Sequence, residues 1–254
     1  MLNISLIKYA LMASMRDKLV ISMLVMFVLG ACLAIFFGSA AVIEKDQFTI
    51  VFAASGLRIL CVLGLVLFVI FFIRRSFESK DIDFLLSRPV GRISLIISYF
   101  LAFSILCVLM SVAVTLALYA VAPHLFGMAH IVWAVSVLVE SIIMVSAALF
   151  FAMYISSASN AAMVTMGFYV LGRMMGQLIG IVDSSMVDSS GFLAMALQTV
   201  SMVTPRLDLL GQSSWLIYGL ADNEFGIMQV MIQGVVFCSL VLGAACFDFS
   251  KRSF

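Results

Sequence analysis

The chain has 254 residues, of which 65% are apolar and 11% are charged, and its mean hydropathy is +1.24. Soluble domains are about 45–50% apolar and about 25% charged, so the composition excludes a water-soluble fold, which could not hide this much apolar surface. The net charge of +1 favours neither nucleic acid nor an acidic macromolecule as a partner.

Residues 1–16 have the pattern of a short amphipathic helix. Apolar side chains recur at helical spacing from Ile4 to Met15, whereas Lys8 lies off this stripe. Such a helix is typical of a segment that lies in the membrane interface. We therefore predict an interfacial helix ahead of the first membrane span.

Six apolar runs follow, and each is long enough to cross a bilayer, which takes roughly 20 residues. The sequence therefore predicts an all-α polytopic membrane protein with six transmembrane helices, in which residues 1–254 form a single transmembrane domain. The runs cover residues 19–43, 48–73, 93–122, 130–155, 161–182 and 227–247.

Residues 183–226 separate the last two runs and hold too many apolar side chains for a free loop. We expect two short outer helices here that dip into the membrane or lie on its surface. They would either gate an exit, through Pro205, Asp208 and Trp215, or only cap the helix bundle.

Basic residues indicate the orientation, because cytoplasmic loops carry an excess of Lys and Arg. With the N-terminus inside, ten Lys and Arg residues lie in inside segments and two in outside segments. Both termini are therefore predicted to be cytoplasmic. The inside residues are Lys8, Arg16, Lys18, Arg74, Arg75, Lys80, Arg88, Arg92, Lys251 and Arg252, and the outside residues are Lys45 and Arg206.

The chain lacks the patterns of membrane enzymes and metal sites. It has no His-Glu-x-x-His or Gly-x-Ser-x-Gly motif, and its five cysteines lie in apolar runs without a Cys-x-x-Cys pair. We predict no catalytic residue, no metal site and no enzymatic activity. The sequence also lacks a Gly-x-x-x-x-Gly-Lys-(Ser/Thr) P-loop, so any ATP must bind to another polypeptide.

Three charged residues lie within the apolar runs: Arg58, Glu140 and Arg173. Counted along ideal helices, all three lie about 14–16 Å from the outer surface. A lone charge there costs at least roughly 2.5–3.5 kcal/mol, so we expect Glu140 to pair with Arg58 or Arg173. The positive excess would face a water-filled transport path or an anionic head group; alternatively, the three residues only tie helices together.

Gly172, Gly176 and Gly180 recur every four residues in the fifth run. Small residues at this spacing let helices approach closely. We expect them to pack against another helix, either within the chain or across a dimer.

The one long charged segment is 74–92, between the second and third runs. On a helix it would group Ile82, Leu85 and Leu86, and Pro89 would end that helix. A hydrophobic knob with a charged rim is suited to docking in a protein groove. An ordinary basic loop is the alternative interpretation.

The residues of this segment resemble a known family. Glu78, followed by Asp-Phe-Leu-Leu-Ser-Arg-Pro-Val-Gly-Arg at 83–92, closely resembles the membrane subunits of the type-two family of ABC transporters. Thr-Pro-Arg-Leu-Asp-Leu-Leu at 204–210 resembles, more weakly, a stretch that these permeases carry before their last span.

The resemblance implies that 74–92 is a cytoplasmic coupling helix seated on an ATPase subunit. It implies two permease subunits, here a homodimer, with two copies of the ATPase, which would bind ATP and Mg. It also implies a bacterial inner membrane and export by alternating access, with membrane lipids as neighbours. A wide apolar interior with a few charges near the outer leaflet suits an amphipathic or lipid-like substrate. The coupling residues would be Glu78, Asp81, Ile82, Asp83, Leu85, Leu86 and Arg88.

Two other functions stay open from the sequence. The first is a non-transporting ABC assembly that transmits ATP-driven motion to a partner at the outer surface. The second is a secondary transporter, although such proteins usually show inverted repeats and interrupted helices, which the sequence does not display.

Overall fold

The computed structural model describes residues 4–40, 44–79, 91–123, 126–183, 195, 199–200, 204–213, 215–218 and 224–251. All regular secondary structure in these ranges is helical, which confirms the all-α fold. The helices are α1 (Ile4–Met15), α2 (Lys18–Ala40), α3 (Lys45–Glu78), α5 (Arg92–Val121), α6 (Met128–Tyr154), α7 (Ala158–Asp183), α9 (Leu207–Leu210), α10 (Trp215–Tyr218) and α11 (Glu224–Lys251).

Five of the described helices are long and apolar enough to cross a membrane: α2, α3, α5, α6 and α11. The chain is therefore a multi-pass membrane protein. The predicted fifth span, 161–182, forms α7, which has 26 residues. Arg173 and Gln177 lower its hydropathy, and α7 is not among the five.

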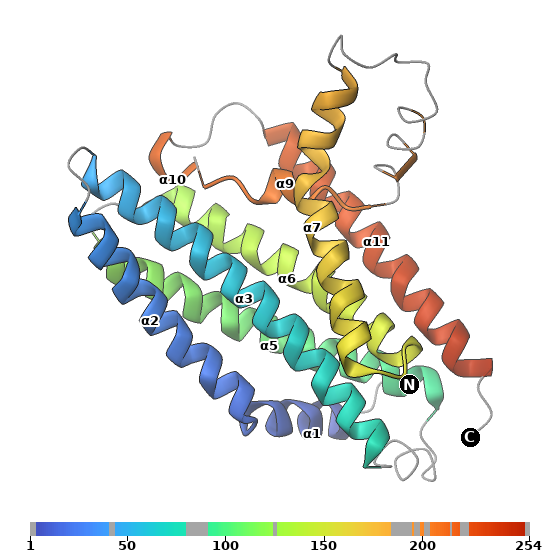
Figure 1. The fold of residues 1–254 in the computed structure, drawn as a ribbon. Helices are drawn as coiled ribbons and strands as arrows, with labels where there is room; N and C mark the ends of the chain where they lie inside the picture. Colours follow the sequence, from blue (N-terminus) through green and yellow to red (C-terminus); the bar gives the residue numbers. More distant parts are fainter. Residues whose placement is uncertain are drawn as a thin grey trace.

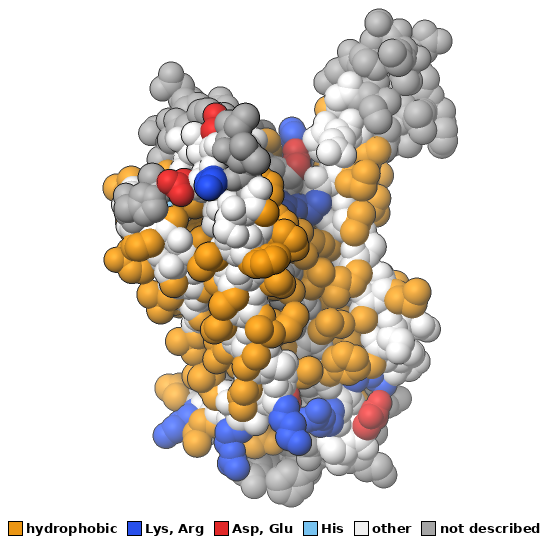
Figure 2. Space-filling model, turned by 60° about the vertical axis from the view of Figure 1, so that its left-hand side comes forward, with side chains coloured by type: hydrophobic (Ala, Val, Ile, Leu, Met, Phe, Trp, Pro, Cys, Tyr) orange, Lys and Arg blue, Asp and Glu red, His pale blue; other side chains and the backbone are white. Residues whose placement is uncertain are grey.

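The long helices form one bundle, with α3 and α6 at its centre (Figure 1). α3 packs against α2, α5 and α6, and α11 packs against α5 and α6. α3 and α6 are the most buried of the five apolar helices, whereas α2 and α11 expose most of their surface. On the face drawn in Figure 2, exposed apolar side chains form a broad apolar belt across the middle of the molecule, as contact with lipid tails requires.

α1 lies across one end of the bundle (Figure 1) and packs against α5. Its buried residues are Leu6, Ala10 and Ser14, whereas Ile4 and Met15 are exposed. The apolar stripe identified in the sequence is therefore only partly packed on the bundle: Ile7 contacts the core, whereas Ile4 and Met15 point outward. The buried residues Leu6 and Ala10 lie beside the stripe.

The end that carries α1 also gathers most of the described basic side chains (Figure 2), and we call it the basic end. The sequence predicts a span that stops at residue 73, but α3 continues unbroken to Glu78. The predicted coupling segment 74–92 is described up to residue 79 and again from residue 91. Both of these residues lie at the basic end (Figure 1). The basic residues are Lys8, Arg16, Lys18, Arg74, Arg75 and Lys251.

Candidate functional site

The structure brings the three charged residues of the apolar runs together, from α3, α6 and α7. Arg58 Nη1 lies 3.1 Å from Glu140 Oε2, and Arg173 Nε lies 3.6 Å from Glu140 Oε1. The side chains of Arg58 and Glu140 are 1% and 0% exposed, and that of Arg173 is 22% exposed. The pairing expected from the sequence is therefore present, and Glu140 bridges both arginines.

Both Nη atoms of Arg58 are held by polar groups, and its guanidinium also faces an aromatic ring. Its Nη2 donates a hydrogen bond of 2.6 Å to Ser136 Oγ, and its Nη1 donates to the backbone carbonyl of Leu210 as well as to Glu140. Its guanidinium lies 5.2 Å from the ring centroid of Trp133, a cation–π contact. One side chain of α3 thus joins α6 to the short helix α9.

Arg173 has a more open environment. Apart from the ion pair with Glu140, its guanidinium lies 5.9 Å from the ring centroid of Tyr169, one turn earlier on α7. Neither of its Nη atoms donates a hydrogen bond to a described residue. A Cβ added at Gly211 would overlap the tip of Arg173, so this guanidinium rests against the backbone after α9.

The segment that contains α9 is packed into the bundle. Leu207 and Leu210 are 0% and 1% exposed. A Cβ added at Gly172 would lie 3.0 Å from Leu207, and one added at Gly176 would collide with Asp208. Two of the three glycines therefore let α9 approach α7 closely, whereas a Cβ at Gly180 would meet no described atom within 4 Å.

A residue that the sequence analysis overlooked anchors this segment to α11. Gln233 Nε2 donates a hydrogen bond of 3.1 Å to the carbonyl of Thr204, and its Oε1 accepts one of 3.4 Å from the backbone of Arg206. The available signal was the presence of two side-chain amides, Gln229 and Gln233, within the apolar run 227–247, since polar groups inside a membrane need partners.

The residues predicted for an outer gate lie at the end opposite the basic end. Pro205 is buried, and Asp208 Oδ2 forms an ion pair of 3.0 Å with Arg206. Trp215 is 8% exposed, and its helix α10 packs against α3 and α6. The predicted gate residues therefore lie in or near the segment that contains α9. The charge cluster, which consists of Arg58, Glu140 and Arg173, contacts the same segment.

Of the predicted coupling residues, the structure describes Glu78, which is exposed in the last turn of α3. The others lie outside the described residues. They are Asp81, Ile82, Asp83, Leu85, Leu86 and Arg88.

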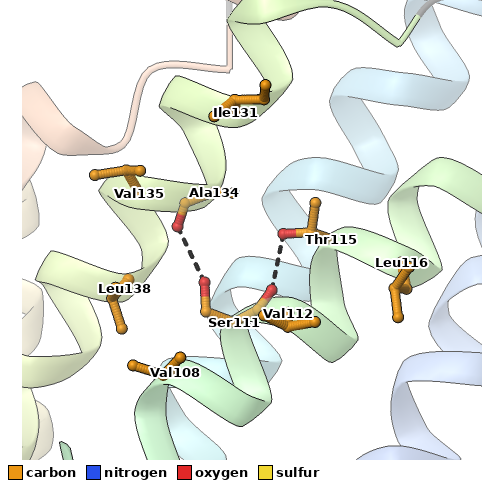
Figure 3. A pocket seen from close by; sticks show the side chains of 9 residues that line it. All are labelled: Val108, Ser111, Val112, Thr115, Leu116, Ile131, Ala134, Val135 and Leu138. Atoms are coloured by element: carbon orange, nitrogen blue, oxygen red, sulfur yellow. Dashed lines mark hydrogen bonds between the residues drawn. The ribbon is translucent and has the colours of Figure 1, made fainter. Parts of the chain in front are cut away.

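An apolar groove lies between α5 and α6, away from the charges (Figure 3). Its volume is about 300 Å³. Ser111 Oγ donates a hydrogen bond of 3.0 Å to the carbonyl of Ala134, and Thr115 Oγ1 donates one of 2.8 Å to that of Ser111. Both hydroxyls are therefore satisfied internally, and the groove offers no polar group for recognition.

The described residues contain no cluster of three or more His, Cys, Asp or Glu side chains that could hold a metal ion. The chemistry that the charge cluster offers is therefore ion pairing and hydrogen-bond donation by arginine. No protein-family model matches the chain, and no curated protein sequence matches it.

Proposed function

We propose that the chain is the membrane-spanning permease subunit of an ATP-driven ABC transporter. The observation that carries this proposal is the sequence after Glu78, in particular Asp-Phe-Leu-Leu-Ser-Arg-Pro-Val-Gly-Arg at 83–92. The position of its flanking residues supports the proposal, since 79 and 91 both lie at the basic end (Figure 1). A coupling segment has to face the cytoplasm, which is the side that basic loops favour.

We propose six spans, with α7 as the fifth and both termini in the cytoplasm of a bacterial cell. At about 1.5 Å per residue, the 26 residues of α7 exceed the roughly 30 Å thickness of the hydrocarbon core. Its intramembrane charge, Arg173, is paired with Glu140, which reduces the cost of crossing.

In the proposed mechanism, two cytoplasmic ATPase subunits bind ATP and Mg and close on each other. Their closure would move the coupling segment 74–92 of each permease subunit in a homodimer. α3 is one unbroken helix, so a displacement at Glu78 would reach Arg58, about 30 Å away. Because Arg58 holds the carbonyl of Leu210, that displacement would move the α9 segment and alternate access to a path for an amphipathic or lipid-like substrate.

The partnership is tested by purifying the tagged full-length chain from cells that naturally express it. We expect a P-loop ATPase to co-purify and the Leu86→Asp variant to lose it. The matched control is Met128→Asp, which places the same charge at a residue 71% exposed at the opposite end and should keep the ATPase. Absence of any P-loop ATPase, or an undisturbed complex with Leu86→Asp, would overturn the proposal.

Export is tested separately, on proteoliposomes of the assembled complex that contain a fluorescent phospholipid. ATP-dependent movement of this probe to the other leaflet would support transport. ATP hydrolysis without movement of this or other amphiphiles would instead favour a complex that transmits motion to an outer partner.

A further inference from the structure

The charges that meet around α9 do not balance. Three arginines, Arg58, Arg173 and Arg206, meet two carboxylates, Glu140 and Asp208. Charge inside or near the hydrocarbon is expensive unless it is paired. One positive charge in this group is therefore available to an anion.

The contacts identify which arginine carries the unbalanced charge. Arg58 is 1% exposed and donates to a carboxylate, a hydroxyl and a carbonyl. Arg206 has its own partner, Asp208, at 3.0 Å. Arg173 shares a carboxylate that Arg58 already binds, and at the longer distance of 3.6 Å. The Nε atoms of Arg58 and Arg206 also lack a hydrogen-bond partner among the described residues, but both atoms are buried. The Nη donors of Arg173 have no described acceptor, and its side chain is 22% exposed, so Arg173 is the arginine that presents unused donors to an incoming anion.

Arg173 is also reachable from outside. Its side chain is 22% exposed, and Figure 2 shows basic and acidic atoms in a recess near the upper end of an otherwise apolar face. The partly exposed charges of α7 and α9 are Arg173, Arg206 and Asp208. An amphiphile lying against the apolar belt could thus place its polar group next to this recess.

A second donor lies beside Arg173. Tyr169 is 6% exposed, and its buried hydroxyl lies close to Glu140 but forms no hydrogen bond of standard geometry with a described residue. Its ring lies under the Arg173 guanidinium. A guanidinium fork and a neighbouring hydroxyl can both donate hydrogen bonds to a phosphate or carboxylate, and charge-assisted bonds from the guanidinium are the strong ones.

We propose that Arg173, with Tyr169, binds the phosphate group of an anionic amphiphile in the recess between α7 and the segment after α9. Gly211 positions the guanidinium, because any side chain at 211 would displace its tip. The identification of this amphiphile as the transported substrate rests on the proposed function; the binding site itself does not.

The test uses the purified full-length chain alone. Native mass spectrometry compares retention of phosphatidylglycerol with that of phosphatidylcholine of the same acyl chains, and a thermal-shift assay adds inorganic phosphate. We expect the wild-type chain to prefer phosphatidylglycerol, and Arg173→Met to reduce that preference by about tenfold, the loss expected for a charge-assisted contact. Gly211→Ala should weaken the preference for phosphatidylglycerol while leaving the charge of Arg173 in place.

Arg173→Met should fold, because Arg58 still neutralises Glu140. The control for general attraction of anionic lipid is Arg75→Met, which removes one charge from a side chain 70% exposed at the basic end and should change the preference little. Arg173-dependent stabilisation by inorganic phosphate would support a site for a free anion, and dependence on phosphatidylglycerol alone would support a lipid head group.

The proposal is overturned if Arg173→Met keeps the wild-type preference, or if Arg75→Met reduces it equally. These outcomes are independent of the ATPase experiment. An unchanged lipid preference in a variant that still co-purifies with the ATPase refutes the Arg173 site alone. A missing ATPase refutes the proposed function and leaves the lipid measurement valid.

Discussion

The two arginines around Glu140 should differ sharply in their contribution to stability. Arg58→Met removes the closer ion pair, the donor to Leu210 and the donor to Ser136. Removing one partner of a buried ion pair typically costs about 3–5 kcal/mol. We expect about 3 kcal/mol here, at the lower end, because Arg173 remains 3.6 Å from Glu140.

Arg173→Met should be nearly neutral or slightly stabilising. It leaves the pair of Arg58 and Glu140 at 3.1 Å intact and removes the excess positive charge from the membrane. Adding Glu140→Gln to Arg58→Met should restore about 1 kcal/mol or more of the lost free energy of unfolding, because the glutamine amide places no charge in the buried site.

The assay is unfolding by SDS in mixed micelles, followed by tryptophan fluorescence. The chain has two tryptophans, and a Trp215→Phe background leaves Trp133, whose ring lies 5.2 Å from Arg58, as the reporter. Equal destabilisation by Arg58→Met and Arg173→Met would refute the assignment of Arg58 as the structural tie. So would an Arg58→Met variant as stable as the parent.

Two further predictions concern helix contacts and use the same unfolding assay. Gly172→Val should destabilise the chain by about 1–3 kcal/mol, because the side chain would press on Leu207. Gly180→Val should change stability by less than about 0.5 kcal/mol, because an added Cβ there meets no described atom within 4 Å; equal effects of the two variants would contradict the packing described. Asp17→Ala should cost about 1 kcal/mol, because Asp17 caps the first turn of α2 with a hydrogen bond of 2.9 Å. Arg75→Met should cost less, because it removes only the ion pair with Asp17, in which Arg75 is 70% exposed. Equal costs for the two variants would show that the ion pair, and not the cap, carries the contribution of Asp17.

The sequence by itself determined the long helices, because a run of about 20 apolar residues has few alternatives to a helix in a membrane. It also placed Arg58, Glu140 and Arg173 at one depth, since depth follows from residue count along a helix. Ion pairing followed from the cost of a lone charge. These are local properties, and no knowledge of neighbouring helices is needed to infer them.

Only the tertiary structure decided how these elements meet. Arg58 and Glu140 are 82 residues apart in the chain, and Arg58 and Leu210 are 152 apart. No local pattern shows that Arg58 is enclosed and Arg173 open, or that α9 is buried against Gly172. Both features depend on which faces of the helices pack together. One carboxylate can also bind two arginines unequally, and only the side-chain geometry determines whether Arg58 or Arg173 lies closer to Glu140.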